Sequence, residues 1–391
     1  MAPSDSDARR ALLPAGLRDG LPPDAAQRAA VIERLIAEFG AHGYERVEPP
    51  LVEFEDSLLP SGPGAGPEIF RLMDPLSQRM MGVRADLTIQ VARIATTRLA
   101  GQPRPLRLSY AGDVLRVKGT QLRPERQFVQ VGAELIGAPS VAADVEVVRL
   151  AADALAAIGV TGLSIDLNAP PLVPAVLAAF GLAGKPAAAL RAALDRKDAD
   201  AVAASAGPAA AALGGLLAAT GPARAALMIL TTVELPEAAQ AHRTRLAAVV
   251  SALLESAPEL RLTVDPVENR GFEYHTGIAF TLFGRFVRGE LGRGGRYLAG
   301  TAVAAGSAGE PATGFSLFMD TVLRAVPESA PVSRIFLPHG TALDRARELR
   351  EVGWVTVAGL EPAGAPAAEA RRLGCSHVWQ DGAIVEVEAK P

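Results

Sequence analysis

The sequence predicts an α+β protein, and three stretches with different patterns support this prediction. Residues 106–137 read as a strand, a polar loop and a second strand, with the strands at about 106–116 and 128–136. Residues 170–256 are rich in alanine and form helical runs without the alternation typical of strands. From about residue 331, short strand-like and helical runs alternate, which favours a compact α/β appendage.

The composition favours a folded protein with two or three domains, because the chain has 391 residues and 49% of them are hydrophobic. The formal net charge is -4 and no basic block of five residues occurs, so we expect no nucleic-acid partner. Cys375 is the one cysteine, and the five histidines lie far apart without metal-ligand spacing. We therefore expect neither a metal nor another cofactor.

Two segments bear on targeting and membranes. Residues 9–10 are basic, but Pro14 and Arg18 follow where a signal peptide needs an apolar core. Residues 201–223 carry no charge and are long enough to span a bilayer, yet they are mostly alanine and glycine and include Pro208. We expect short packed helices there, no membrane partner, and a cytoplasmic protein, which the low cysteine usage also favours.

The first hundred residues predict a disordered start, two helices and several strand segments. Residues 1–13 are expected to be disordered, and a helix is expected at 25–39 with Asp24 as its N-cap. The prolines at 49–50 break a strand-like segment, as at a sheet rim or an interface strand. The remaining segments are a strand-like run at 44–58, a hairpin at 69–73 and 78–83, and a helix at 86–99.

Alternation on the predicted strand 128–136 puts Gln130, Gly132 and Glu134 on one face and apolar side chains on the other. An amide and a carboxylate separated by a glycine leave open space above the sheet, as in the floor of a small-molecule site. An ordinary hairpin with a solvated polar face has the same alternation, and the spacing alone leaves both interpretations open. Asp86 and Thr88, near a helix start, either hold a ligand near free amides or simply cap the helix.

After the alanine-rich stretch, the sheet is expected to resume with strands at 261–265 and 272–283. A glycine-rich turn is expected next, holding Arg288, Arg293 and Arg296. Its glycines would let backbone amides approach a ligand, or would only form a tight hairpin. Residues 312–324 read as a short strand that enters a helix.

Several segments occur in a distinctive order: GYERVEPPLVEF, VLRVKGTQLRPERQFVQVGAE, RGFEYHTG, GRGGRY and GFSLFMD. In this order they resemble the class II aminoacyl-tRNA synthetase core, and most closely its histidyl-tRNA synthetase branch. The resemblance covers about residues 10–325. It implies an antiparallel sheet flanked by helices, built as a homodimer.

The resemblance also implies a pocket that binds L-histidine. Asp86, Thr88 and Gln130 would hold the amino group of the ligand. Glu134 would accept a hydrogen bond from the imidazole. Asp86 stands where the synthetases have a longer glutamate, and it reaches less far.

The rest of the implied pocket contains two arginines and three rings. Arg116 and Arg270 would pair with the carboxylate of the ligand, because the guanidinium fork matches two oxygens. Tyr110, Tyr274 and His275 would line the pocket. His275 stands where the synthetases usually have a tyrosine.

The departures from the synthetase pattern concern ATP and tRNA. The last motif of the synthetases ends in Glu-Arg, and here Asp320 and Thr321 occupy those positions. Lys118 stands where the motif 2 loop carries an acidic residue. Amino-acid activation needs positive charge on the phosphates, which a threonine cannot supply. The residues after 331 are also fewer than an anticodon-binding domain needs.

A synthetase-like chain with these losses resembles the regulatory subunits of ATP phosphoribosyltransferase. That family implies a non-catalytic protein that pairs with a short-form catalytic subunit in a hetero-octamer and mediates histidine feedback on the first step of histidine biosynthesis. One alternative is an active histidyl-tRNA synthetase or a tRNA-independent histidine-activating ligase. Another is a scaffold on which Gln130 and Glu134 are inert surface.

The expected layout follows from the resemblance and the composition together. The synthetase-like core would comprise residues 14–169 and 257–328. Residues 170–256 would be a helical insert within it, and residues 331–391 a small α/β domain. At about sixty residues, that last domain is near the lower limit for independent folding.

Overall fold

The computed structural model describes residues 12–58, 68–121, 123–268, 274–300, 309–328 and 332–387. The chain divides into two compact units, Met1–Pro327 and Glu328–Pro391. The larger unit contains the segments predicted as core together with the alanine-rich stretch. The expected disorder at 1–13 falls almost entirely outside the described residues.

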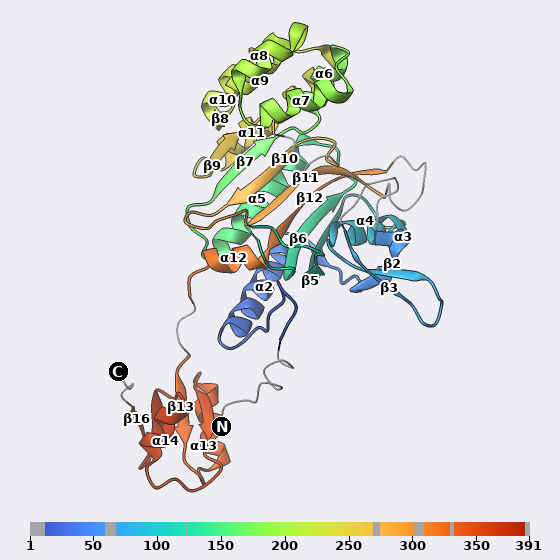
Figure 1. Cartoon of the computed structure of the whole chain (residues 1–391). Helices are drawn as coiled ribbons and strands as arrows, with labels where there is room; N and C mark the ends of the chain where they lie inside the picture. Colours follow the sequence, from blue (N-terminus) through green and yellow to red (C-terminus); the bar gives the residue numbers. More distant parts are fainter. Residues whose placement is uncertain are drawn as a thin grey trace. The chain divides into compact units, whose positions relative to one another are not determined.

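A nine-stranded sheet forms the centre of the larger unit (Figure 1). The six central strands, β5, β6, β12, β11, β10 and β7, pair antiparallel with their neighbours. Strand β1 pairs with β5 in parallel, and β9 pairs with β7 in parallel. In sheet order the strands are β1 (Glu45–Arg46), β5 (Leu106–Leu115), β6 (Gln127–Ile136), β12 (Glu310–Phe318), β11 (Gly292–Ala299), β10 (Ala279–Phe283), β7 (Ser164–Asn168), β9 (Arg261–Val264) and β8 (Gly221–Pro222).

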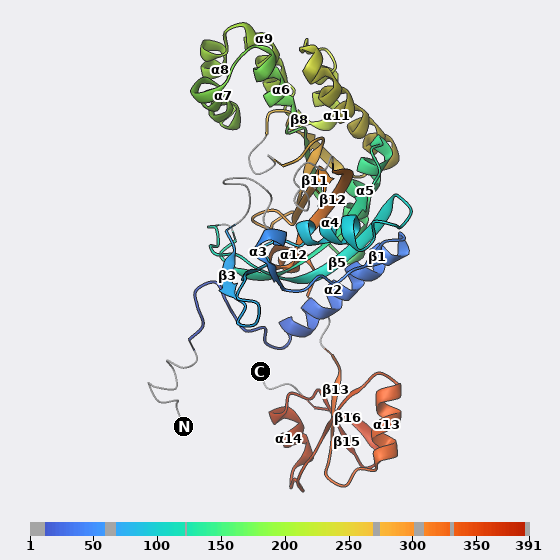
Figure 2. The ribbon, with the colours of Figure 1, turned by 90° about the vertical axis from the view of Figure 1, so that its right-hand side faces the viewer.

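The two faces of this sheet bury different helices. Helices α2 (Asp24–Ala41) and α5 (Val141–Ala157) pack on the face to which β6 contributes Val131, Ala133 and Leu135. Helix α4 (Thr88–Thr97) packs on the opposite face, where its apolar residues join Tyr110 in a second core (Figures 1 and 2). The predicted alternation of β6 therefore separates an apolar face from a polar one.

Helix α2 follows the predicted apolar spacing, because Val31, Leu35 and Phe39 are buried. The prediction that Asp24 caps this helix is wrong. Pro23 is the N-cap and Asp24 is the first helical residue. Its carboxylate still lies at the positive end of the helix dipole.

The proline-containing segment forms the edge of the large sheet and part of a smaller one. Strand β1 is the outermost strand beside β5, which agrees with the expected sheet rim. A three-stranded sheet follows in the order β2-β4-β3, with β3 and β4 as the predicted hairpin. These elements are β2 (Val52–Phe54), α3 (Glu55–Leu58), β3 (Phe70–Met73) and β4 (Met80–Val83).

The alanine-rich stretch is a group of short helices at the β7–β9 end of the sheet (Figure 1). They are α6 (Leu172–Ala179), α7 (Gly184–Asp195), α8 (Ala199–Ser205), the 3-10 turn η1 (Gly207–Ala209), α9 (Ala210–Ala218), α10 (Ala223–Leu230) and α11 (Glu237–Ser256). The expectation that no strand occurs here is wrong for Gly221–Pro222, which pair with β9. No helix in the described part of the chain is long and apolar enough to cross a membrane.

The predicted glycine-rich turn is also wrong. Gly292–Ala299 is strand β11 in the middle of the sheet, and the turn lies before it, around Phe286 and Gly289. The glycines fit a crowded sheet: a Cβ on Gly294 would lie 2.3 Å from the carbonyl oxygen of Gly314. Strand β10 begins at Ala279, later than predicted, and residues 269–273 are outside the described residues.

The smaller unit has its own α/β fold. Its four-stranded sheet has the order β14 (Val355–Ala358), β13 (Arg334–Leu337), β15 (His377–Gln380) and β16 (Ala383–Glu386). Helix α14 (Pro366–Arg372) packs on Phe336, and helix α13 (Leu343–Glu351) packs on Ile335 and Leu337. Alternate residues of one strand thus contact helices on opposite faces.

Candidate functional site

The α4 side of four adjacent strands carries the polar residues of the sheet in register. Tyr110 of β5 pairs with Gly132 of β6, Gly132 with Ser316 of β12, and Ser316 with Arg293 of β11. In the next row on this face, Glu134, Gly314 and Gly295 lie opposite one another. These two rows form the floor of the candidate site.

The floor contains glycines at positions where neighbouring atoms leave no room for a side chain. A Cβ on Gly314 would lie 1.8 Å from Glu134 Oε2, and a Cβ on Gly132 would lie 2.5 Å from the Tyr110 hydroxyl oxygen. The prediction of open space above Gly132 is therefore wrong, because the Tyr110 ring and the Phe315 carbonyl fill that position, and the glycines that line the cavity are Gly294, Gly295 and Gly314.

A cavity of about 300 Å³ lies above the floor. Six of the nine predicted site residues line it: Asp86, Thr88, Arg116, Glu134, Tyr274 and His275. Gln130 and Tyr110 lie directly behind this wall and hydrogen-bond to members of it. The ninth residue, Arg270, is outside the described residues.

Gln130 fixes the end of the cavity nearest to α4. Its Nε2 donates to Asp86 Oδ2 at 3.0 Å and to Ser316 Oγ at 2.5 Å, while its Oε1 accepts from the Leu87 amide at 3.1 Å. The other oxygen of Asp86 accepts from the Thr88 amide at 2.7 Å. Asp86 therefore accepts from the first amide of α4, which confirms the capping interpretation, and it also lines the cavity, while its role in holding a ligand stays a prediction.

Glu134 occupies the opposite end and is fully enclosed. Its Oε1 accepts from the Tyr110 hydroxyl at 3.2 Å, and its Oε2 accepts from the Tyr297 hydroxyl at 2.9 Å. Burial raises the pKa of Glu134 to about 8, although the Tyr297 hydrogen bond partly offsets that rise. Its carboxyl group is thus poised to change protonation state near neutral pH.

Two aromatic rings close the cavity over Glu134. The His275 ring is buried, and its centroid lies 3.9 Å from the centroid of the Tyr274 ring. Tyr274 is 59% exposed, so it lies at the mouth of the site, whereas His275 lies deeper. A flat ligand ring entering here would contact both side chains.

Arg116 supplies positive charge to the cavity wall. Its guanidinium lies over the rings of Phe128 and Phe318, at 4.6 Å and 5.6 Å from their centroids. Burial and the neighbouring Arg123 lower the pKa of Arg116 to about 10. Among the described residues, no carboxylate lies within ion-pair distance of Arg116, so an anionic ligand would find an available cation.

Arg123 differs from Arg116 because its charge is already matched within the protein. Its Nε and Nη2 donate to the two oxygens of Asp320, each at 2.9 Å, and Glu290 lies 3.7 Å from Nη1. The side chains of Arg123 and Asp320 are 5% and 1% exposed. Arg123 also stacks on the ring of Phe318 at 4.0 Å.

The remaining residues that distinguish this chain from a synthetase lie away from the cavity wall. Thr321 is fully buried, and its hydroxyl has no hydrogen-bond partner in the described part of the chain. Lys118 is exposed on the loop and pairs with Glu68 at 3.3 Å. Neither side chain lines the cavity.

Sequence reasoning did not assign Arg293, Tyr297 and Ser316 to this site. The structure places all three on its floor or wall. Alternation along Gly292–Ala299 would have found the first two, had this segment been predicted as a strand. Ser316 had the same type of signal, because it alternates with Gly314 and Phe318 on β12.

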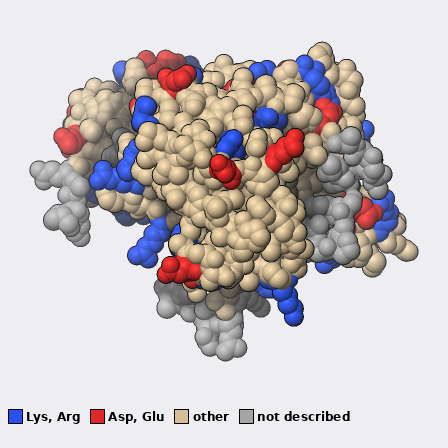
Figure 3. Space-filling view, turned by 90° about the horizontal axis from the view of Figure 1, so that it is seen from above, with Lys and Arg blue, Asp and Glu red and all other residues tan. Residues whose placement is uncertain are grey.

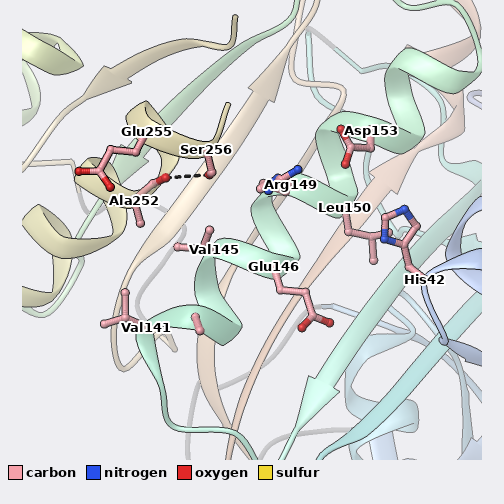
Figure 4. Close-up of a pocket in the computed structure, with 11 residues that line it drawn as sticks. His42, Val141, Val145, Glu146, Arg149, Leu150, Asp153, Ala252, Glu255 and Ser256 are labelled. Atoms are coloured by element: carbon pink, nitrogen blue, oxygen red, sulfur yellow. Dashed lines mark hydrogen bonds between the residues drawn. The ribbon is translucent and has the colours of Figure 1, made fainter. Parts of the chain in front are cut away.

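A wider groove of about 790 Å³ lies on the surface, between α5, the end of α11 and His42 (Figure 4). Glu146 from α5 lines it but already accepts two hydrogen bonds from Arg107 and one from Tyr44. Ser256 donates to the Ala252 carbonyl within its own helix. Glu146 and Ser256 thus have partners within the protein, and the groove is more open than the cavity above β6 and β12, which makes that cavity the stronger candidate.

One face of the molecule and the described His, Cys, Asp and Glu residues bear on two other types of site. On the face in Figure 3, basic and acidic side chains are scattered among uncharged ones without a continuous basic patch. No group of three or more His, Cys, Asp or Glu side chains among the described residues could hold a metal ion.

Comparison with known proteins identifies the family. Two relatives called ATP phosphoribosyltransferase regulatory subunit are each 59% identical to this chain. The one from Rhodospirillum centenum aligns over 97% of both chains, and the one from Paramagnetospirillum magneticum over 97% of this chain and 99% of its own. This chain belongs to the ATP phosphoribosyltransferase regulatory subunit family.

A family model and solved structures show which fold this chain shares. A sequence model of the histidyl-tRNA synthetase family matches residues 16–322. A Bacillus halodurans structure titled ATP phosphoribosyltransferase regulatory subunit/histidyl-tRNA synthetase has a TM-score of 0.78 at 24% identity, covering 95% of this chain and 97% of its own. Histidyl-tRNA synthetase from Nostoc has a TM-score of 0.78 at 16% identity, covering 94% and 90%. The predicted class II synthetase-like α+β fold is confirmed.

Proposed function

We propose that this protein is the non-catalytic regulatory subunit of ATP phosphoribosyltransferase, and that it binds L-histidine in the cavity above β6 and β12. It would act in the cytoplasm, on the first step of histidine biosynthesis. The observation that carries the proposal is the 59% identity to regulatory subunits over 97% of the chain. These relatives support the regulatory interpretation over an active histidyl-tRNA synthetase or a histidine-activating ligase.

The chemistry of the cavity supports histidine as the ligand. Asp86, held by Gln130, offers an acceptor for an ammonium group at one end, and Arg116 offers a cation for a carboxylate. At the other end, the carboxyl group of Glu134 would accept from a ring N–H, beside the side chains of Tyr274 and His275. A volume of about 300 Å³ suits a small amino acid.

The ion pair of Arg123 and the burial of Thr321 support a binding role without chemistry. Phosphoryl and adenylyl transfer need exposed positive charge on the phosphates. Arg123 is instead neutralised by Asp320, and a buried threonine takes the place that the resemblance assigns to the phosphate-binding arginine. Histidine would therefore be bound and not activated.

In this proposal the protein forms a homodimer through its synthetase-like core and joins a short-form catalytic subunit in a hetero-octamer. Histidine binding would favour one conformational state of the complex over another. By linkage, histidine would change the affinity of this protein for the catalytic subunit by some factor, and the catalytic subunit would change the affinity for histidine by the same factor. The corresponding coupling free energy is typically about 1–3 kcal/mol.

Co-purification with the catalytic subunit tests the partner. The two chains, expressed together, should elute as one complex whose phosphoribosyl transfer falls when L-histidine is added. The catalytic subunit alone should respond less to histidine. A catalytic subunit that neither binds this chain nor changes its rate in its presence contradicts the regulatory role, whereas a complex insensitive to histidine favours a scaffold.

Calorimetry with L-histidine tests the pocket. The complex with Glu134→Ala should lose measurable binding, because the imidazole loses its acceptor. Glu255→Ala is a matched control, because it removes an exposed carboxylate from the surface groove and not from the cavity. Equal affinity in the Glu134→Ala and unmodified complexes would place histidine elsewhere.

ATP–pyrophosphate exchange in the presence of histidine tests the enzyme alternative. We expect no exchange above the background set by a sample without histidine. An active histidyl-tRNA synthetase provides the positive control. Robust exchange by this protein would contradict the non-catalytic proposal.

A further inference from the structure

Arg293 is a second guanidinium in the cavity that carries Arg116, and the synthetase resemblance assigns it no role. It stands on β11 in the same row as Ser316, Gly132 and Tyr110. Its side chain lines the cavity together with Asp86, Thr88 and Glu134 and is 35% exposed. A cation on the floor of an enclosed site attracts an anionic group of a ligand.

The register of the sheet locates Arg293 relative to the two ends of the cavity. The row of Arg293 lies between two other rows on this face. One of them contains Glu134, and the other contains Gln130, which pairs with Phe318. Rows on the same face are two residues apart, or about 6.8 Å along a strand. An amino acid whose ring reaches Glu134 would therefore have its backbone carboxylate near the row of Arg293.

A neighbouring carboxylate orients the Arg293 side chain. Glu290, three residues earlier, accepts from Arg293 Nε at 3.1 Å and from Nη2 at 2.5 Å. Glu290 also lies 3.7 Å from Arg123, so its charge is shared between two guanidinium groups. Asp320 is the main partner of Arg123, and the shorter contact of Glu290 is the one with Arg293.

The cavity also brings Arg293 near Arg116. The positive charge of Arg293 contributes to lowering the pKa of Arg116, after the larger effects of burial and Arg123. Two cations that repel each other in a partly buried site gain from an anion placed between them. A carboxylate suits both, because each guanidinium presents a planar fork of N–H donors.

We propose that Arg293 determines specificity for an α-carboxylate by binding it jointly with Arg116. The proposal deepens the proposed function, since it rests on histidine occupying this cavity. It makes the site selective for the free amino acid over analogues in which the carboxylate is reduced or removed. The ion pair with Glu290 then holds the Arg293 side chain ready for the ligand.

A comparison of two ligands tests this role. Calorimetry on the complex would measure L-histidine and L-histidinol, which carries a hydroxymethyl group in place of the carboxylate. The unmodified protein should bind histidine more tightly than histidinol. Arg293→Ala should weaken histidine binding about tenfold or more and change histidinol binding much less, so that discrimination between the two falls.

Two further variants make the test specific. Arg288→Ala removes an exposed arginine from the preceding turn, outside the cavity wall, and should leave discrimination unchanged. Arg293→Lys keeps the charge without the fork and should restore discrimination in part. If circular dichroism shows that Arg293→Ala does not fold, Arg293→Lys alone provides the test.

The outcomes separate this inference from the proposed function. Histidine binding with unchanged discrimination in both Arg293 variants overturns the role of Arg293 and leaves the histidine pocket intact. Equal affinity of the unmodified protein for histidine and histidinol overturns carboxylate recognition altogether. An unmodified complex that binds no histidine overturns the proposed function, and the inference with it.

Discussion

Two buried regions of the larger unit match their charges differently: the Glu134 end of the cavity, and the Arg123–Asp320 pair, which does not line the cavity. In the first, the ligand-facing end, the Glu134 carboxyl group accepts from the hydroxyls of Tyr110 and Tyr297 and contacts no cation in the described part of the chain. In the second, the internally matched end, the Arg123 guanidinium has a bidentate carboxylate partner in Asp320. The first arrangement leaves a polar group for a ligand to contact, whereas the second meets its ionic requirement within the protein.

Disruption of the internally matched end should have the largest effect on stability. Asp320→Ala leaves Arg123 buried without its main counter-charge, so we expect a loss of about 3–5 kcal/mol in the free energy of unfolding. Urea denaturation of the larger unit would measure it. Asp56→Ala removes a 91% exposed partner of Arg79 and should cost less than about 0.5 kcal/mol. Similar small losses in both variants would show that the Arg123 pair is not structural.

Crowding of the ligand-facing end should abolish binding at a smaller cost in stability. Gly314→Ala would place a Cβ 1.8 Å from Glu134 Oε2, so the carboxyl group would have to move. We expect destabilisation of about 1–3 kcal/mol and loss of measurable histidine binding. Gly101→Ala, with open space around the added carbon, should change neither. Normal histidine affinity in Gly314→Ala would contradict the position of the pocket.

Glu134 should make the stability of the protein depend on pH. Because the pKa of Glu134 is raised to about 8, the folded protein holds a proton there that the unfolded chain releases above its ordinary value of 4.5. The contribution of Glu134 to stability is therefore present below about pH 4.5 and is lost as pH rises towards 8, with a slope of at most about 1.4 kcal/mol per pH unit. Glu134→Gln should remove this component from unfolding measurements at pH 5–9. An identical pH profile in the two proteins would argue against an elevated pKa.

Ser316→Ala should have the smallest effect and shows how the ligand-facing end is held. The Ser316 hydroxyl accepts from Gln130 Nε2 and shares a hydrogen bond of 3.0 Å with the Tyr110 hydroxyl. Its loss should cost about 1 kcal/mol in stability and weaken histidine binding several-fold, because Gln130 loses one of its partners. Ser77→Ala, in the exposed β3–β4 turn, is the comparison variant for calorimetry and denaturation. Unchanged histidine affinity in Ser316→Ala would mean that Gln130 is held without it.

Much of the sheet could be predicted from sequence because its signals are local. Alternation on β6 placed Gln130 and Glu134 together on the polar face, whereas the open space predicted above Gly132 is filled by the Tyr110 ring, which comes from another strand. The β3–β4 hairpin and the packed helices between 201 and 223 also follow from short-range patterns.

The sequence predictions were wrong where the role of a residue depends on contacts with residues that are distant in sequence. Glycines usually indicate turns, but Gly294 is needed because the backbone of β12 lies too close to leave room for a side chain. The mistaken turn concealed the alternation that brings Arg293 and Tyr297 into the site. The partner of Arg123 could not be predicted either, since Asp320 lies 197 residues away.

The enclosed pair of Arg123 and Asp320 has a consequence for the evolution of this protein. Thr321 directly follows Asp320 and is fully buried, so an arginine at position 321 would add a charge to a closed interior in which Arg123 and Asp320 already neutralise each other. Thr321→Arg alone would thus destabilise the chain. A cation at this position would need a second substitution that supplies its counter-charge.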